Sequence, residues 1–369
     1  MGGVAFYISG HGFGHASRQI EIVNALGAAS PATPILIRTS APRWLFDRTV
    51  RVPVTLVPGE IDTGVVQIDS LHLDATETIR RASAFYQTLD ERARAEATLL
   101  HHHRISGVVS DAPPLGCAAA HAAGIPSIVI SNFTWDWIYD GYGEELREAP
   151  GLRETIRQTY ALAAGGWRLP MYGGFESIAP LADLPFVARH ARHARAEVRQ
   201  VCGLPADRPI ALLSFGGYGV RDVDLRRLDC LDAVTVLLTH DGTFDEAVPD
   251  GVALLAEPHL YGSGLRYEDL VAAVDVVITK PGYGIISECV ANQTALLYTS
   301  RGRFVEYDVL VREMPRFLRC GYIDHEDLFS GRWGASLAAL LASPAPPEDP
   351  PTNGAEVTAR MLLERLAGC

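Results

Sequence analysis

Short continuous runs of apolar residues alternate along the chain with longer amphipathic segments, and this rhythm predicts strands joined by helices. In the first half, strands are expected at 4–9, 35–39, 52–57, 107–110 and 127–131, with helices at about 15–28, 75–102 and 114–123. In the second half, strands are expected at 210–215, 234–239, 252–255, 274–279 and 295–299, with helices between the later ones. Continuous apolar runs are typical of parallel strands that helices cover on both faces. The pattern therefore predicts an α/β chain of two Rossmann-like halves.

A stretch of irregular sequence separates the two halves. Glycines and prolines punctuate residues 165–206, and the chain of 369 residues exceeds the length at which one hydrophobic core stops growing, ~250 to 300 residues. We expect an N-terminal domain over residues 1–175 and a C-terminal domain over 176–350. A proline-rich spacer then leads into a last amphipathic helix within 351–369.

Composition and charge narrow the classes of function. Hydrophobic residues make up 48% of the chain and charged residues 21%, which is typical of an ordinary folded protein. The 44 acidic residues outnumber the 32 basic ones and give a net charge of −12, so nucleic acid is excluded as a partner. No apolar run reaches the ~18 residues of a membrane span, and no secretion signal is visible, so we expect a cytoplasmic protein without membrane insertion. The six cysteines are spaced singly, which argues against disulfides or a zinc site, and we expect no metal.

Glycines surround the junction between the first strand and the first helix, in the run Gly10-His11-Gly12-Phe13-Gly14-His15-Ala16-Ser17-Arg18. Glycines let a backbone approach a ligand closely, and free N–H groups at a helix start favour an anionic or hydroxyl-rich ligand. NAD is rejected, because its fingerprint needs Gly or Ala where His15 stands and an acid after the second strand, which ends Arg38-Thr39-Ser40. His15 is the candidate general base, since an imidazole accepts protons near neutral pH. Arg18 is expected to anchor the helix through a carboxylate.

A second strand–loop–helix junction has the same form, in the run Thr279-Lys280-Pro281-Gly282-Tyr283-Gly284-Ile285-Ile286-Ser287-Glu288. Backbone amides after Gly282 are placed to meet a diphosphate. Glu288 either holds ribose hydroxyls or complements the helix dipole. Lys280, the only lysine in the chain, is either a required ammonium or a chance survivor of replacement by arginine. Gly216 and Gly217 form a third glycine turn after the first strand of the second half.

Polar residues also follow other strands of the first half. Asp111 comes directly after an apolar strand, at the edge where open α/β sheets bind ligands. Trp135 is expected in the core, as aromatic side chains usually are, or against a sugar. Asn132 and Asp136 beside it favour a polar acceptor pocket.

These motifs together resemble a known family. The sequence is similar to the glycosyltransferase-like N-terminal region of plant L-arabinokinases and its free-standing bacterial relatives. The similarity lies in the pattern G-H-G-F-G-H-x-x-R, Asp111 followed by Pro113, the segment from Ser131 to Tyr139, Phe215-Gly216-Gly217 and K-x-G-Y-G-x-x-S-E. The match covers most of the chain. More distantly, the loops resemble the UDP-N-acetylglucosamine transferase of peptidoglycan synthesis and the UDP-sugar hydrolase of pseudaminic acid synthesis.

The resemblance implies a GT-B fold, with a nucleotide-sugar donor mainly on the C-terminal half and the acceptor mainly on the N-terminal half. The last helix is then expected to cross back to the N-terminal domain. Carried over position by position, the resemblance implies that His15 is the loop base and that Gly12 and Gly14 are the loop glycines. It also implies that Gly216 and Gly217 form the second-domain turn and that Glu288 is the ribose-binding acid. The candidate donor site comprises Gly216, Gly217, Lys280, Gly282, Tyr283, Gly284, Ser287 and Glu288, and the candidate acceptor and loop residues are His11, Gly12, Phe13, Gly14, Asn132, Trp135 and Asp136.

The sequence thus predicts a metal-independent glycosyltransferase that uses a UDP-sugar and no further cofactor, with His15 and Asp111 as catalytic residues. Two alternatives stay open. In a nucleotide-sugar hydrolase on the same fold, His15 would activate water instead of an acceptor. A catalytically silent module that senses sugar nucleotides would keep the binding loops without turnover. The kinase domain of the plant proteins has no counterpart in these residues, so kinase activity does not carry over.

Overall fold

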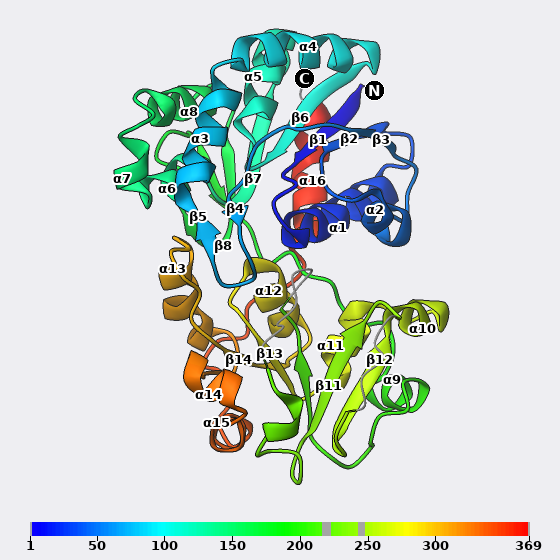
Figure 1. Ribbon diagram of the computed structural model, residues 1–369. Coiled ribbons are helices and arrows are strands. Elements are labelled where there is room, and N and C mark those ends of the chain that lie inside the picture. Colours follow the sequence, from blue (N-terminus) through cyan, green and yellow to red (C-terminus); the bar gives the residue numbers. More distant parts are fainter. Residues whose placement is uncertain (1, 216–222, 243–247, 368–369) are drawn as a thin grey trace.

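Seven parallel strands form the first sheet, in the upper half of Figure 1. The structure, a computed structural model, describes residues 2–215, 223–242 and 248–367. The strand order is β3-β2-β1-β6-β7-β8-β9, and every neighbouring pair is parallel. The strand bounds are β1 Gly3–Ile8, β2 Ile35–Thr39, β3 Thr55–Pro58, β6 Ile105–Asp111, β7 Ser127–Phe133, β8 Gly166–Gly173 and β9 Leu181–Asp183.

Alternate side chains of β1 enter different cores, which is why its sequence reads as one continuous apolar run. Val4 and Phe6 pack into the core on the side of α1, whereas Ala5 and Tyr7 pack into the core on the opposite face. The helices of this half are α1 Phe13–Ala29, α2 Arg43–Thr49, α3 Ala75–Tyr86, α4 Leu89–His102, α5 Pro114–Ala123, α6 Trp135–Asp140, α7 Gly143–Leu146 and α8 Leu152–Tyr160.

The second sheet has six parallel strands in the order β12-β11-β10-β13-β14-β15. The strand bounds are β10 Ile210–Leu213, β11 Thr235–His240, β12 Val252–Ala256, β13 Val276–Thr279, β14 Ala295–Tyr298 and β15 Cys320–Tyr322. The helical elements are α9 Arg195–Val201, η2 Leu225–Arg227, α10 Glu257–Gly262, α11 Tyr267–Ala273, α12 Tyr283–Ala291, α13 Tyr307–Glu313, η3 Met314–Arg316, α14 His325–Ser330 and α15 Gly334–Leu341. Two separate parallel sheets with helices between their strands confirm the predicted α/β fold class.

Several elements differ from the sequence prediction. The helix expected over 75–102 is two helices, because Thr88 between α3 and α4 turns its hydroxyl to the carbonyl of Phe85 and competes with the helical hydrogen bonds. The stretch 165–206, expected to be irregular, contains β8, β9 and α9. The first sheet extends past residue 175, since the short edge strand β9 pairs with β8. The edge strand β15 was not expected, because its three residues include a glycine and stay partly exposed.

Two segments reach from one half of the chain to the other. The last helix, α16 Gly354–Ala367, lies against α1 and contributes Ala359 and Leu362 to the core of the first half (Figure 1). The antiparallel hairpin of β4 Val66–Gln67 and β5 Leu73–Asp74 extends the opposite way. At its tip, Ser70 donates to the carbonyl of Phe215 (2.8 Å), and Leu71 is buried in the core of the second half. The two halves are therefore joined by crossing elements as well as by their linker.

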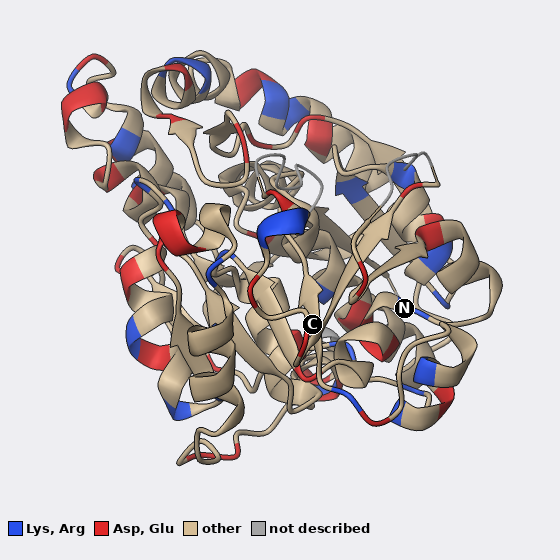
Figure 2. Cartoon of the chain, turned by 60° about the horizontal axis from the view of Figure 1, so that its bottom comes forward, with Lys and Arg blue, Asp and Glu red and all other residues tan. Residues whose placement is uncertain are grey.

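Charged residues of both signs are mixed along the helices and loops, while the strands are mostly free of them (Figure 2). Among the helices that the structure describes, none has the length and apolar character needed to cross a membrane.

Candidate active site

His15 and Asp111 meet at the carboxyl ends of neighbouring strands. β1 and β6 are paired with Ile8 opposite Asp111. His15 lies in the first turn of α1, and its Nδ1 is 3.0 Å from Oδ2 of Asp111. Asp111 also accepts a hydrogen bond from Arg18, one helical turn beyond His15. The expectation that Arg18 anchors the helix through a carboxylate is confirmed.

The charge of Asp111 fixes the proton on the histidine. Burial favours the neutral carboxyl group, but the charges and hydrogen bonds of Arg18 and His15 outweigh it and hold the pKa of Asp111 below its ordinary value. The ionised carboxylate is the strongest acceptor near Nδ1, so Nδ1 carries the proton and donates it to Asp111. Nη2 of Arg18 is 2.8 Å from Nδ1, but it donates to Asp111 and Ser131. Nε2 of His15 is thus left free to accept a proton.

The first turns of α1 and α12 touch each other where the two halves meet. A Cβ atom added to Gly284 would lie 3.2 Å from Cα of Gly14, so a glycine at position 284 allows this close approach without a shift of the two helices. The residues before the two helices, Gly12 and Gly282, provide no side-chain cap, and neither helix has an acid in its first turn. The free N–H groups and positive dipole ends of both helices therefore lie close together, which favours an anion near them.

A buried cation lies beside these helix starts. Lys280 follows β13, and its ammonium group makes no hydrogen bond or ion pair with any residue in the described part of the chain. Burial, together with the charge of Arg301, lowers the pKa of Lys280 to about 7, although Glu306 opposes the shift. Arg301 itself is buried and paired with Glu306 at 3.1 Å. Among the residues that the structure describes, none forms an ion pair with the ammonium group of Lys280.

Glu288 lies in α12, five residues after the start of the helix, and its carboxylate is engaged. Nε of Arg189 donates to Oε1 at 2.7 Å, and Arg189 also pairs with Glu268 at 3.4 Å. Burial raises the pKa of Glu288, while Arg189 opposes that shift. The predicted ribose ligand is therefore one end of a buried Glu–Arg–Glu network, and Arg189 comes from the irregular linker that the sequence left without a role.

The three predicted acceptor residues, Asn132 at the end of β7 and Trp135 and Asp136 at the start of α6, support the site through contacts with other protein groups. Asn132 accepts from Arg18 and donates to the carbonyl of Pro170. Trp135 is fully buried, and its Nε1 donates to Asp62 at 3.0 Å. Asp136 is buried and pairs with Arg157 at 3.0 Å. None of these three side chains lines the large pocket described below.

Tyr283 and Ser287 line a small cavity between the halves, together with Gly284, Arg18 and Asn132. The hydroxyl group of Ser287 donates to the carbonyl of Tyr283. The ring of Tyr283 packs near Phe133, and its buried hydroxyl group has no partner among the described residues.

The other loop positions lie at the surface or outside the described ranges. Phe13 is 39% exposed and packs edge-on against Trp44, with 5.5 Å between ring centroids. Gly216 and Gly217, the third glycine turn, lie outside the described residues. No cluster of histidine, cysteine or acidic side chains able to hold a metal ion occurs within residues 2–215, 223–242 and 248–367.

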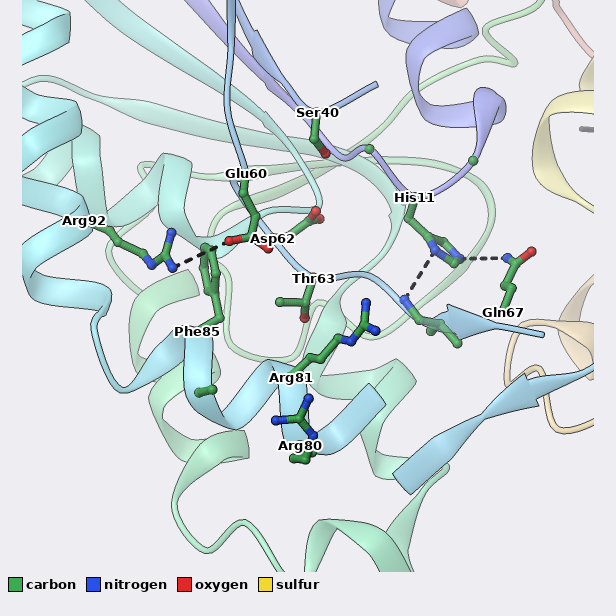
Figure 3. A pocket seen from close by; sticks show the side chains of 14 residues that line it. His11, Ser40, Glu60, Asp62, Thr63, Gln67, Arg80, Arg81, Phe85 and Arg92 are labelled. Carbon is green, nitrogen blue, oxygen red and sulfur yellow. Dashed lines mark hydrogen bonds and ion pairs between the residues drawn. The ribbon is translucent and has the colours of Figure 1, made fainter. Parts of the chain in front are cut away.

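A pocket of about 520 Å³ opens beside the glycine loop of the first half (Figure 3). Its lining includes Gly10, His11, Gly12, Ser40, Asp62 and Arg81. Nδ1 of His11 accepts from the backbone N–H of Val65 at 3.3 Å, and its ring centroid is 6.4 Å from that of His15. Burial, with the nearby charges of His15, Arg301 and Lys280, lowers the pKa of His11 to about 3, so this side chain is neutral.

Sequence reasoning missed most of this pocket. Asp62 and Thr63 follow β3, and Ser40 follows β2, so all three lie at the carboxyl end of the sheet like Asp111. Asp111 was selected because open α/β sheets bind ligands at the carboxyl ends of their strands, and the same argument applies to Asp62, Thr63 and Ser40. Arg80 and Arg81 lie on α3, where charged residues are usually solvated, so their place at the pocket carries no signal in the sequence.

Comparisons with known proteins agree with this architecture. No protein-family model matches the chain. The chain is 29% identical to the L-arabinokinase of Arabidopsis thaliana over 371 residues, covering 99% of the chain and 34% of the relative. It is 27% identical over 192 residues to a UDP-N-acetylglucosamine–N-acetylmuramyl-(pentapeptide) pyrophosphoryl-undecaprenol N-acetylglucosamine transferase of Clavibacter michiganensis, covering 49% of the chain and 46% of the relative. The chain thus spans about a third and about half of these two curated relatives.

A solved structure decides the fold. The glycosyltransferase UGT2 of Phytolacca americana, complexed with UDP-2fluoro-glucose and pterostilbene, superposes with a TM-score of 0.60 at 11% identity, over 98% of this chain and 94% of that one. The chain has the GT-B fold. In this GT-B chain, His15 and Asp111 come from the first half and Lys280 and Gly284 from the second, so the described site draws on both halves.

Proposed function

We propose that this chain is a glycosyltransferase that moves a sugar from a UDP-sugar to a hydroxyl group of an acceptor, without a metal ion. The observation that carries the proposal is the convergence of two uncapped helix starts and an unpaired ammonium next to a histidine held by a buried carboxylate. UDP is favoured because UDP appears in the names of one curated relative and two structural neighbours.

The first half supplies the base. Nε2 of His15 takes the proton from the acceptor hydroxyl group as its oxygen attacks the anomeric carbon of the sugar. Asp111 then faces an imidazolium through Nδ1 and stabilises its charge. A general base in this position contributes a factor of ~10² to 10⁴ to the rate.

The second half accepts the leaving group. The bond between the anomeric carbon and the β-phosphate oxygen breaks, and the electron pair stays on the diphosphate. The N–H groups at the start of α12, with Lys280 and Arg301, stabilise the added charge in a site that excludes much of the water. Lys280 gains in the diphosphate the counterion that the described protein residues do not provide. Glu288, held by Arg189, then faces the ribose hydroxyls.

Calorimetric titration with UDP, GDP, ADP, dTDP and NAD tests the nucleotide site before the acceptor is known, and UDP is expected to bind best. Release of UDP from a panel of UDP-sugars, with and without candidate acceptors, then measures turnover. His15→Gln is expected to slow turnover ~10² to 10⁴-fold while UDP affinity stays within threefold. His121→Gln on the exposed face of α5 is the matched control and should change neither.

Three results would contradict the proposal. Free sugar released at full rate without an acceptor would make the protein a hydrolase. Normal UDP binding with no turnover of any donor would make it a sensing module. Binding of NAD while all sugar nucleotides fail would remove the donor assignment altogether.

A further inference from the structure

We infer that the pocket beside the glycine loop binds an anionic, hydroxyl-rich acceptor, a sugar that carries a phosphate or carboxylate group. The inference rests on the proposed function only in calling this ligand the acceptor. The chemistry of the ligand follows from the residues that line the pocket.

The polarity of the pocket excludes an apolar ligand. Only Val65, Ala84 and Phe85 contribute apolar side chains to its lining. An apolar molecule would bury the remaining polar groups without partners, and each such group costs ~1 to 3 kcal/mol. The volume of about 520 Å³ lies within the range of ~300 to 1,000 Å³ found for small-molecule sites.

The inner end of the pocket is built to receive hydroxyl groups. Asp62 is 5% exposed, and its orientation is fixed because Oδ2 accepts from the indole of Trp135. Thr63 and Ser40 add hydroxyl groups beside it, and Figure 3 shows Asp62 and Thr63 on the wall opposite Arg81. A buried carboxylate flanked by hydroxyl groups accepts hydrogen bonds from a polyol, which is the usual form of sugar recognition at a polar site.

The mouth of the pocket carries an excess of positive charge. Arg80, Arg81 and Arg92 line it, against the single carboxylate of Glu60 at this level. Arg80 and Arg81 share Glu77, which lies outside the pocket, and Arg81 uses only Nε for that contact. Figure 3 shows both guanidinium groups reaching into the pocket from α3. In a chain of net charge −12, guanidinium donors left free at one opening favour a phosphate or carboxylate.

Arg92 and Glu60 line the side of the mouth opposite Arg80 and Arg81. Nη2 of Arg92 is 3.6 Å from Glu60, Nε donates to Thr88, and the guanidinium group lies over the ring of Phe85 at 4.0 Å. Arg92 is therefore held in place and is only partly neutralised. An anionic group between α3 and α4 would meet guanidinium groups from both helices.

The position of the pocket suits transfer. His11 separates it from the general base, with 6.4 Å between the ring centroids of His11 and His15. His15 and Asp111 both act electrostatically on Asp62, so the inner end of the pocket lies within electrostatic reach of this pair. A hydroxyl group at the inner end and the anionic group at the mouth thus define the orientation of the acceptor.

Calorimetry on the full chain without nucleotide tests the inference. The probes are a panel of sugar phosphates and uronic acids, glucose 6-phosphate and glucuronate among them, with the matching neutral sugars and inorganic phosphate. We expect at least one anionic sugar to bind tenfold or more tightly than both its neutral partner and phosphate. Arg81→Gln should remove that preference, and Asp62→Asn should weaken the binding of neutral and anionic sugars alike. Arg94→Gln, an exposed charge on α4 outside the pocket, should leave binding unchanged.

Each other outcome overturns the inference. Equal affinity for neutral and anionic sugars removes the role of the arginines, and equal affinity for phosphate alone reduces the pocket to an anion site. A complete lack of binding by the panel removes the ligand class. Whether the phosphate or the carboxylate probes bind better identifies the anionic group. UDP titration of the same protein reports the proposed function separately, because Arg81→Gln should leave UDP affinity unchanged.

Discussion

Asp111 is fully buried and serves two cationic partners at once. It orders the imidazole of His15 and neutralises the guanidinium group of Arg18. Removing one partner of a buried charge network leaves the other charges uncompensated, which costs more than the pair contributes to stability. The same carboxylate therefore affects both the folding and the chemistry of the first half.

We predict that Asp111→Asn lowers the free energy of unfolding by ~3 to 5 kcal/mol, because Arg18 loses its buried counterion. Urea denaturation at pH 7 measures this. Since the folded-state pKa of Asp111 lies below its ordinary value, its contribution is present at neutral pH and is lost as the pH falls through the folded-state pKa. The difference between parent and variant should therefore shrink in acid. Asp308→Asn, an exposed acid on α13, should stay within about 0.5 kcal/mol, and an equal loss there would contradict the assignment.

Lys280, in contrast to Asp111, lowers the free energy of unfolding at neutral pH. Its pKa in the folded chain is about 7, against an ordinary value of 10.5. Below pH 7 both states are charged and the folded state carries the full cost of burying the ammonium. Between pH 7 and 10.5 the cost declines, because only the unfolded chain still holds the proton, and above 10.5 it disappears. The protein thus keeps a destabilising residue next to the proposed diphosphate site.

Lys280→Met is expected to be more stable than the parent at pH 6.5, with the gain decreasing steadily toward pH 10. Denaturation curves at pH 6.5, 8 and 9.5 measure the trend. The same variant should bind UDP at least tenfold more weakly, since the diphosphate loses a buried cation. Arg312→Met, an exposed cation on α13, serves as control and should show neither effect. A variant less stable than the parent at pH 6.5 would refute the role of burial.

At the level of elements, the continuous apolar runs predict most buried strands well and the edge strands poorly. They also miss the largely buried β8, whose sequence Arg168 and Pro170 interrupt. β2 and α5 have the predicted bounds, because a continuous apolar run or an alanine-rich segment has one favourable environment. β9 and β15 have short, partly exposed sequences, so only pairing with a neighbouring strand defines them. The β4–β5 hairpin was also missed, because its tip is stabilised by the other half of the chain.

The hairpin gives a prediction about closure of the halves. Leu71→Ala should cost ~2 to 5 kcal/mol of unfolding free energy, as should Leu337→Ala in the same core. Of these two residues, only Leu71 comes from the other half of the chain, and Gly302 lets its backbone approach closely. Leu71→Ala alone should therefore increase the radius of gyration measured by X-ray scattering. Identical scattering from Leu71→Ala and the parent would show that the hairpin does not hold the halves together.

At the scale of the whole molecule, the sequence predicts which residues lie together at the edge of each sheet. It does not predict which side chains from other parts of the chain contact them. His15, Asp111 and Arg18 were within reach because β1 and β6 are neighbours in one sheet. The pairing of Glu288 with Arg189 could not be predicted, since Arg189 lies in a linker whose sequence shows no periodicity. The arginines of the pocket could not be predicted for a different reason: they lie on α3 and α4, and the sequence of a surface helix does not show which groups its charged side chains face.

The contact between Gly14 and Gly284 sets the spacing of the two halves, and a matched pair of variants tests it. Both residues lie in helices, so alanine at either position is favourable for the helix by up to about 1 kcal/mol. A Cβ at Gly14 would meet the other half at 3.7 Å, an ordinary contact, but at Gly284 it would meet Cα of Gly14 at 3.2 Å and force a shift of a few tenths of an ångström.

Because a misplacement of 1 Å can cost ~10²-fold in rate, we expect Gly284→Ala to slow turnover about tenfold and Gly14→Ala to change it little. Neither variant should lose stability in thermal denaturation, so the rate difference reports geometry and not unfolding. UDP titration should give equal affinities, since the N–H groups of α12 keep their places within the second half. Equal turnover for the two variants would mean that the halves do not set the reaction distance through this contact.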